Sequence, residues 1–530
     1  MSRRVTAMML AALGAAGGGA SCGAREPAAG GSESSSAGDV GAPSARATGA
    51  AEPHAGATAT APGIGPAPGL DRVTPPPPPP PGAAPAPAGP ALRWAHLWPT
   101  PGYELVRGAV ATPDGGVVFF GRFEGALATG PVPVASQGAS DGFAVKLAGD
   151  GSVAWARAIG GTLYDEVLGA AIAPDGTVLL AGALRGRARI GGGAGDAAGE
   201  VGTGVDDAPL LLELRPDGTV RGARTLTGGG NAMGVAPAAE GGTVVAGWDL
   251  QAGACKDGTA VAGLLAADGR PRWWLCMQSA GFGMLQHVVV DTAGDVAACG
   301  TFRLRLELAG QVYWAVAPDF MHVAGGPDQV FVVKISAAGG AVQWVYVVPS
   351  DGSARCEDLA ALPDGSVALV GSYAGYFDVP RHRAPGDGSD GYVAVVSYGG
   401  SLEWARVFPG DGPDAVNGAD YAGGALLVSG TRSPGADLGG ARSAAAGAFL
   451  AALDPVGAVV WATAFSGGDD TFVAAAPDGT VWLAGYTFVS EHAAPPPVDL
   501  GGGPLTPAPA GEYDNGDLFA AHFAAPHPLR

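Results

Sequence analysis

The segment FAVKLAGDGSVAWARAIGGTLYDEVLGAAIAPDGTVLLAG, Phe143 to Gly182, predicts two consecutive β-hairpins. Its apolar runs are short and rich in Val, Leu and Ala, which is typical of strands buried on both faces. The triplets Gly149-Asp150-Gly151 and Pro174-Asp175-Gly176 separate these runs. Proline presets a turn, aspartate bonds back to the backbone, and glycine accepts a positive φ, so both triplets predict tight turns.

The same unit recurs along the chain and is marked by an anchor residue in its last strand. The anchors are Trp94, Trp155, Gly222 in place of a tryptophan, Trp273, Trp344, Trp404 and Trp461. A hairpin with a Pro-Asp-Gly turn, or a degenerate copy of it, follows each anchor. Seven four-stranded units with Gly and aromatic residues in phase predict an all-β fold, a seven-bladed β-propeller. The anchor tryptophans are then expected to pack between blades.

The two ends of the repeat region complement each other. ALRWAHLW (Ala91–Trp98) has an anchor but no preceding partner strand, whereas LFAAHFAA (Leu518–Ala525) has the partner position but no following anchor strand. We therefore expect the N-terminal strand to complete the last blade and close the ring. This closure removes two exposed sheet edges, which would otherwise promote aggregation.

The repeat resembles the bacterial SBBP and NHL-like β-propeller repeats, in particular those of exported myxobacterial proteins. The resemblance covers residues 91–530 and is clearest in GFAVKLAGDGSVAWARAIGG (Gly142–Gly161) and VDLGGGPLTPAPAGEYDNGDLFAAHF (Val498–Phe523). It implies a propeller and export. It implies no activity, because this family has no shared catalytic motif.

Residues 1–22 predict a lipoprotein signal peptide. Basic Arg3 and Arg4 precede the apolar run Val5–Ala16, and small residues lead to Cys22, which would become the lipidated first residue. Gly19 stands where leucine is usual, so an ordinary secretory signal is the alternative. We therefore expect a protein of the cell envelope, at the outer membrane or in the periplasm, that meets the membrane only through a lipid anchor, or else a secreted protein.

Residues 23–90 predict a disordered tether that leads to the propeller at residues 91–530. Ala, Gly, Ser and Pro dominate this stretch, and Pro75–Pro81 is an unbroken proline run. Such a composition cannot bury enough apolar surface to offset the entropy of ordering. The proline run is expected to be an extended polyproline II spacer.

The charge of the chain restricts its partners. The formal net charge is −20, which argues against nucleic acid, because phosphate binding needs clustered Lys and Arg. It also argues against adsorption to anionic lipid. A cationic ligand, a metal ion or a neutral polymer remains compatible with this charge, and we expect a monomer.

One face of the predicted propeller is the candidate binding face. Antiparallel strand order places the connections from strand two to strand three on the same face as those from strand four to the next strand one. The connections between strands two and three are long, for example Arg185–Ala208, Arg303–Gln329 and Thr487–Gly516. Binding function concentrates in loops on a rigid scaffold, so we expect a ligand to meet this long-loop face.

Polar residues recur near the start of strand one and are expected to converge at the channel mouth on this face. They are Glu104, Asp165, Glu166, Asn231, His287, Glu357, Asp358, Asn417, Asp469 and Asp470. Converging carboxylates would suit Ca²⁺, which takes six to eight oxygen ligands, or a cationic ligand. The alternative is that these residues cap turns and stay solvated.

Four cysteines fall in the predicted strands of the third to fifth units. In an exported protein they predict two disulfides, with three possible pairings. The predicted topology favours Cys255 with Cys276 and Cys299 with Cys356. A zinc site is disfavoured, because no pair has close ligand spacing and no histidine cluster accompanies them.

The sequence favours a non-enzymatic binding module. No nucleophile elbow, phosphate-binding loop or zinc-protease motif occurs. The leading hypothesis is an exported lipoprotein that binds a protein or a polysaccharide through its long-loop face. An alternative is a polysaccharide lyase or glycosidase, in which paired carboxylates such as Glu357 and Asp358 would serve as acid and base. A structural spacer is the third possibility, since propellers host many functions.

Overall fold

The structure is a computed structural model that describes most of the chain from Gly89 onward. The described residues are 89–100, 102–129, 134–190, 196, 199–250, 255, 260–315, 327–348, 350–377, 382–384, 388–439, 444–489, 496–509 and 515–525. The predicted signal peptide, with Cys22, and nearly all of the predicted tether lie outside them. No helix among these residues is long and apolar enough to cross a membrane.

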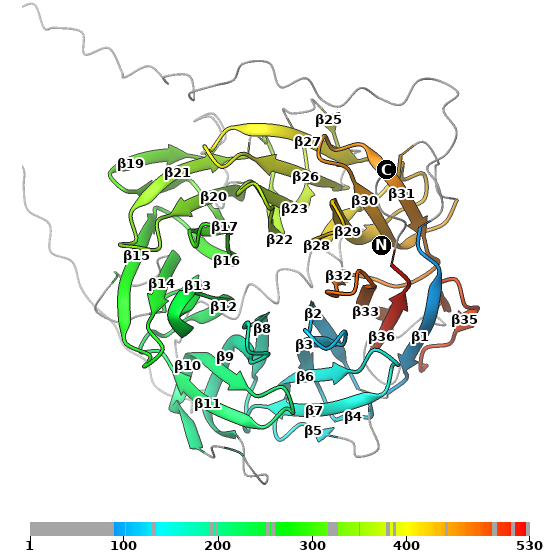
Figure 1. Ribbon diagram of the computed structural model, residues 1–530, viewed down its shortest axis with the longest axis horizontal. Coiled ribbons are helices and arrows are strands. Elements are labelled where there is room, and N and C mark those ends of the chain that lie inside the picture. The colour runs from blue at the N-terminus through cyan, green and yellow to red at the C-terminus, as the bar shows by residue number, and fades with distance from the viewer. Residues whose placement is uncertain are drawn as a thin grey trace, which may run out of the picture. The chain divides into compact units, whose positions relative to one another are not determined.

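Seven antiparallel sheets surround a common axis (Figure 1). Blade 1 contains β2 (Glu104–Ala111), β3 (Val117–Phe123), β6 (Asp141–Leu147) and β7 (Val153–Ile159). Blade 2 contains β8 (Glu166–Ile172), β9 (Val178–Ile190), β10 (Gly199–Leu214) and β11 (Val220–Thr225). Blade 3 contains β12 (Asn231–Pro237), β13 (Thr243–Trp248), β14 (Ala260–Leu265) and β15 (Pro271–Ser279), with the short 3-10 helix η2 (Ala239–Gly241) in its first turn.

The remaining blades repeat this plan. Blade 4 contains β16 (Gly283–Val290), β17 (Val296–Phe302), β20 (Gln329–Ile335) and β21 (Val342–Val347). Blade 5 contains β22 (Ala354–Ala361), β23 (Val367–Tyr373), β26 (Asp390–Val396) and β27 (Leu402–Phe408). Blade 6 contains β28 (Ala415–Ala422), β29 (Ala425–Arg432), β30 (Gly447–Leu453) and β31 (Val459–Ala464). Blade 7 contains β32 (Thr471–Ala475), β33 (Val481–Val489), β36 (Asn515–Phe523) and β1 (Leu92–Trp98).

The first strand of the chain closes the ring. Strand β1 pairs antiparallel with β36, with Trp94 opposite His522 and Trp98 opposite Leu518. Figure 1 shows the last strand, in red, beside the first, in blue. The predicted closure is therefore confirmed. The chain is a seven-bladed β-propeller.

The apolar core is divided among the junctions between neighbouring blades. One cluster joins Phe119 and Phe143 of blade 1 to Trp482 of blade 7. Six further clusters occupy the other six junctions in the same way. Middle strands such as β20 and β26 are buried along their whole length. This burial explains why their sequences are continuous apolar runs rather than alternating ones.

A repeated contact joins the outer strand of each blade to the next blade. The indole ring of Trp155 lies against Gly218, in the turn between strands three and four of blade 2, and its Nε1 donates to Pro216 O at 3.0 Å. Trp273, Trp344 and Trp404 donate in the same way to the turns of the following blades. Gly222 occupies the tryptophan position of blade 2, opposite Glu213, and Arg224 covers the turn glycine Gly269 instead.

Several connections that the sequence predicts as long loops contain strands. Strands β9 and β10 continue through the connection Arg185–Ala208 as an extended hairpin. The connection Arg303–Gln329 contains β18 (Arg305–Leu308) and β19 (Gln311–Trp314), which add to the outer edge of blade 3. Shorter hairpins decorate three other blades: β4 (Ala126–Leu127) with β5 (Val134–Ala135), β24 (Tyr376–Phe377) with β25 (His382–Arg383), and β34 (Val498–Asp499) with β35 (Pro504–Leu505).

Candidate functional site

The innermost strands bring polar side chains toward the axis of the ring. In β2, β22 and β28 the register skips one residue, which leaves Arg107, Glu357 and Asn417 as single-residue β-bulges. A bulge re-aims a side chain and is common beside functional sites. We call the group formed by Arg107, Glu166, Gln286, His287, Arg355, Glu357, Asp358, Asn417 and Asp470 the axial cluster.

Part of the axial cluster serves to join neighbouring blades. Arg107 Nε of blade 1 lies 2.5 Å from Glu166 Oε1 of blade 2. Asn417 Nδ2 of blade 6 donates to Asp470 Oδ1 of blade 7 at 3.1 Å, and the Tyr486 hydroxyl donates to Asp470 Oδ2 at 2.9 Å. These side chains already have partners, so their first role is to hold the inner ends of the blades together.

Asp358 is held by backbone amides, beside a neutral histidine. Its two oxygens accept from Leu359 N at 2.8 Å and from Ala419 N of blade 6 at 3.0 Å. His287 Nδ1 of blade 4 lies 3.6 Å from Asp358 Oδ1. Burial lowers the pKa of His287 to about 4 and raises the pKa of Asp358 to about 7. The Asp358 side chain keeps 29% of its surface exposed, so water still screens part of this burial.

Three side chains of the axial cluster have polar atoms that make no hydrogen bond to a described residue. Among the residues that the structure describes, neither the Glu357 carboxylate nor the Arg355 guanidinium makes a side-chain hydrogen bond. Gln286 Oε1 is buried and likewise accepts none from a described residue. Burial raises the pKa of Glu357 to about 7, and Arg355 opposes this shift. Glu357 therefore changes charge near neutral pH.

Charged side chains from blades that are not neighbours lie within electrostatic range of Glu357. Glu357 of blade 5 is within electrostatic range of Arg107 in blade 1 and Asp470 in blade 7, and Arg355 is within range of Asp470. Blade 5 is a neighbour of neither blade 1 nor blade 7. These groups therefore face one another across the ring axis rather than along one blade.

The structure separates the sequence-predicted mouth residues into two sets. Glu166, His287, Glu357, Asp358, Asn417 and Asp470 belong to the axial cluster, whereas Asn231 begins β12 opposite Trp248. Glu104 and Asp165 are 0% and 2% exposed and lie in the junctions between blades, not in the cluster. Asp469 precedes β32, where its amide donates to Tyr486 O at 2.8 Å.

The two sets arise because the predicted residues occupy different register positions. Glu104 and Asp165 come two residues before the position that faces the glycine of strand two, whereas Glu357 and Asp358 follow it. Sequence reasoning also missed Arg107, Arg355 and Gln286. The only available signal for them was a polar residue inside an otherwise apolar inner strand.

The axial cluster does not show a metal centre. Within the described part of the chain, no group of three or more His, Cys, Asp or Glu side chains is arranged to hold a metal ion. The Asp358 and Asp470 oxygens are occupied by hydrogen-bond donors. The arrangement suits a ligand that brings its own hydrogen-bonding groups or a positive charge better than it suits Ca²⁺.

The cysteines form two disulfides in the pairing that the predicted topology favours. Cys255–Cys276 lies within blade 3, and Cys299–Cys356 joins β17 of blade 4 to β22 of blade 5. Cys299 and Cys356 are each 0% exposed. The second bridge therefore fixes the backbone beside Arg355 and Glu357 against the neighbouring blade.

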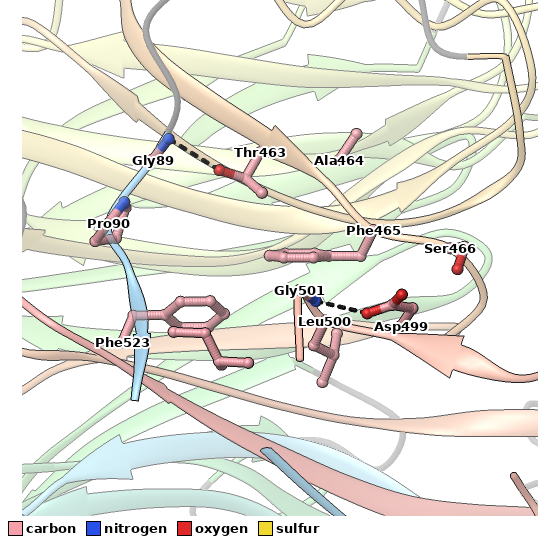
Figure 2. Close-up of a pocket in the computed structure, with 11 residues that line it drawn as sticks. Gly89, Pro90, Thr463, Ala464, Phe465, Ser466, Asp499, Leu500, Gly501 and Phe523 are labelled. Atoms are coloured by element: carbon pink, nitrogen blue, oxygen red, sulfur yellow. Dashed lines mark hydrogen bonds between the residues drawn. The ribbon is translucent and has the colours of Figure 1, made fainter. Parts of the chain in front are cut away.

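A groove of about 460 Å³ lies at the ring closure, away from the axial cluster. Gly89, Thr463, Phe465, Asp499 and Phe523 are among the residues that line it (Figure 2). Its polar groups bond locally: Gly89 N donates to Thr463 Oγ1 at 3.0 Å, and Gly501 N donates to Asp499 Oδ1 at 2.8 Å. We assign this groove to closure of the ring rather than to ligand binding.

Comparison with known proteins finds only distant similarities in structure. The sequence matches no protein-family model and no curated protein. The chain is similar in structure to a fungal alcohol oxidase of the AA5 family in complex with copper, at 12% identity over 82% of this chain and 76% of the other, with a TM-score of 0.40. It is also similar to the Pan2 WD40 domain of Neurospora crassa (10% identity, 80% and 90% covered, TM-score 0.38). A third similar structure is the Dos1 propeller (8% identity, 80% and 95% covered, TM-score 0.37). No activity is drawn from likenesses this distant.

Proposed function

We propose that this protein is an exported interaction module, anchored by lipid at Cys22, that binds a partner at the long-loop face around the ring axis. The propeller fold is consistent with such a module. The observation that carries the proposal is the set of uncommitted side chains, Gln286, Arg355 and Glu357, within a cluster whose other members are bonded between blades. Half-buried polar groups without partners lose hydrogen bonds to water, and a ligand can replace them.

The charges favour a partner that presents a basic side chain. Arg107 is already paired with Glu166, which leaves Arg355 within electrostatic range of both Glu357 and Asp470. A lysine or arginine side chain that enters this site would balance the excess of carboxylates. Charge-assisted hydrogen bonds to carboxylates are about twice as strong as neutral ones. Of the two expected partner classes, this favours a protein with an exposed basic segment over a neutral polysaccharide.

A polysaccharide-active enzyme is the second candidate function, and the titration of Glu357 favours it. A carboxyl group with a pKa of about 7 is suited to donate a proton at neutral pH. Asp358, with both oxygens held by backbone amides, would orient the substrate or stabilise a positive charge. Release of reducing ends or of unsaturated products from polysaccharides by the wild-type protein, lost in Glu357→Gln, would favour this function over simple binding.

Binding to short basic peptides tests the leading proposal. We expect the full-length protein to bind peptides rich in arginine or lysine, in titration calorimetry at low salt, more tightly than it binds neutral polysaccharides. Glu357→Gln removes the charge and is expected to weaken this binding about tenfold. Glu307→Gln is the matched control, because this acid is 46% exposed on the β18–β19 hairpin. Equal weakening in both variants would show that net charge alone drives binding.

Lipid attachment is tested separately from ligand binding. We expect the protein, expressed in a bacterial host, to be recovered in the membrane fraction and to incorporate labelled fatty acid. Cys22→Ser should release it into the soluble fraction. Soluble wild-type protein that carries no lipid would leave the ordinary secretory signal as the correct interpretation of residues 1–22.

A further inference from the structure

Three junctions between blades each bury two carboxyl groups side by side. In each pair, one acid lies at the start of the third strand of a blade and the other lies at or just before the first strand of the next blade. The pairs are Asp141 with Asp165, Asp390 with Asp414, and Asp517 with Glu104. All six side chains are 3% exposed or less. Burial of two acids together is costly unless something positive lies between them.

A single residue contacts both carboxyl groups of each pair. A Cβ atom at Gly160 would lie 2.7 Å from Asp141 Oδ1 and 2.8 Å from Asp165 Oδ2. Gly410 N donates to Asp390 Oδ1 at 3.2 Å, and the α-carbon of Gly410 faces Asp414 Oδ2. Thr100 N donates to Asp517 Oδ1 at 2.8 Å, while its hydroxyl donates to Glu104. The members of each pair are therefore close neighbours.

The two acid positions tend to be occupied together. The equivalent positions are Ala208 and Gly230 between blades 2 and 3, and Gln329 and Ala354 between blades 4 and 5, all uncharged. Among the junctions whose two positions the structure describes, only the one between blades 6 and 7 has a single acid, Asp469, which is partly exposed, opposite Gly447. If each carboxylate only accepted hydrogen bonds from backbone N–H groups, an acid at one position would not need a second acid at the other.

One oxygen in each pair is buried and accepts no hydrogen bond from a described residue. These oxygens are Asp141 Oδ1, Asp390 Oδ2 and Glu104 Oε2. The second acid of each pair is saturated: Asp165, for example, accepts from Gly161 N and Arg185 N, both at 2.7 Å. Each pair thus has one vacant acceptor beside a carboxyl group whose two oxygens both accept hydrogen bonds.

A proton fits this vacancy better than a metal ion. A buried Ca²⁺ needs six to eight oxygen ligands, whereas most carboxylate oxygens here already face N–H or O–H donors. A proton needs only the two facing carboxyl groups. We propose that each of the three pairs holds one proton between its carboxyl groups, so that these blade junctions are closed by protonation and weakened in alkaline solution. This inference does not depend on the proposed function.

The charged groups around each pair do not take the place of such a proton, because the nearby basic side chains have other partners or the neighbours are acidic. Arg185 faces Asp165, but it forms an ion pair with Asp207, with Nε 2.6 Å from Oδ1. Glu104 faces Asp517 and Glu124, both acidic. Around the pair Asp390 and Asp414, His382 Nδ1 lies 3.1 Å from Asp390 Oδ2 and bonds to the Tyr373 hydroxyl at 2.7 Å. The Tyr373 hydroxyl also faces Asp390, and Arg432 faces Asp414 while donating to Phe465 O.

The direction of the pH effect follows from these environments. Burial raises the pKa of Asp141 to about 6, of Asp414 to about 6 and of Glu104 to about 8. The unfolded chain releases these protons near pH 4, so the folded protein binds more protons between about pH 4 and pH 8. The free energy of unfolding must then fall as the pH rises through this window.

Infrared spectroscopy and thermal unfolding test the proposal on the full-length protein. We expect the carbonyl band of protonated carboxyl groups at pH 6, its loss by pH 9, and a melting temperature that falls over this range. Asp141→Asn places an amide N–H where the proton lay, so it should remove about one third of the fall in melting temperature. Asp165→Asn should do the same, and the double variant should add nothing, because one proton serves both groups.

Asp150→Asn alters a fully exposed turn acid and should leave the pH dependence unchanged. A wild-type protein without the protonated carboxyl band at pH 6 would overturn the proposal, and this measurement needs no variant to fold. A melting temperature at pH 8 that Ca²⁺ raises in the wild type but not in Asp141→Asn would assign the pair to a cation instead.

Discussion

Gly89 lies against the indole ring of Trp461, in the place that a turn glycine occupies against every other anchor tryptophan. The equivalent pairs are Trp94 with Gly151, Trp155 with Gly218, Trp273 with Gly340, Trp344 with Gly400 and Trp404 with Gly457. In blade 7 no turn joins the third strand to the fourth, because β36 and β1 come from opposite ends of the folded region. The chain preceding β1 supplies the missing glycine, so the junction at the closure reproduces the contact found elsewhere.

Substitution of Gly89 tests whether this contact stabilises the ring. A Cβ atom at this position would lie 2.8 Å from Trp461 Cε3. We expect Gly89→Val to lower the free energy of unfolding by about 1–3 kcal/mol, the usual cost of overpacking, in chemical denaturation. Gly222→Ala is the matched control, because that glycine has no atom within 4 Å of a Cβ position. Similar losses in both variants would contradict a specific role for Gly89.

The anchor tryptophans are expected to carry a large part of the stability of each junction. Trp404 is 6% exposed, packs on Gly457 and donates Nε1 to Pro455 O at 3.0 Å. We expect Trp404→Ala to cost about 3–5 kcal/mol, as for other buried aromatic side chains. Trp314, 64% exposed on β19, should tolerate the same change within about 0.5 kcal/mol. Thermal and urea unfolding of both variants would measure the difference.

The two disulfides are expected to differ in their accessibility and in their contribution to stability. Cys299–Cys356 spans 57 residues and is buried, whereas Cys255–Cys276 spans 21 residues and is partly exposed. Loop-closure entropy predicts losses of about 4 and about 3 kcal/mol when each is replaced by alanine pairs. Under native conditions, graded reduction followed by alkylation and mass spectrometry should label Cys255 and Cys276 first. Simultaneous labelling of all four cysteines would indicate that the whole ring opens at once.

The proposed binding of basic segments should depend on pH with a definite sign. Burial raises the pKa of both Glu357 and Asp358 to about 7. Below this pH the carboxyl groups are protonated, so affinity for an arginine-rich peptide should rise between pH 6 and pH 8. Glu357→Gln should flatten much of this rise in titration calorimetry. Affinity that falls as the pH rises would require a ligand of the opposite charge.

The repeat architecture could be predicted because its signals are local. Each Asp-Gly turn and each anchor tryptophan acts on its own neighbours in the chain, and even the degenerate Gly222 keeps the register of Trp155. The connection Arg185–Ala208 was predicted as a loop, although Leu184–Ile190 alternates apolar and polar residues as a half-buried strand does. That alternation indicates that the strand continues to Ile190.

The candidate site could be predicted only in part, because its geometry depends on single-residue bulges. A shift of one residue in a strand moves a side chain to the other face. Glu357 is the bulged residue itself and follows the position that faces the strand-two glycine, whereas Glu104 and Asp165 come two residues before that position, although all three stand near the start of an inner strand. The blade-joining role of Arg107 depends on Glu166 in another repeat, and no spacing along the chain indicates that pair.

Closure by β1 also determines how the ring responds to mechanical force. Strand β1 is the outermost strand of blade 7 and is held by its pairing with β36 alone within the sheet. A pull on the chain that precedes Leu92 would load this one ladder before any other blade. Its rupture would detach Trp94 from Gly151 and expose β36 as a free edge. The segment that completes the propeller is thus also the place where tension would begin to dismantle it.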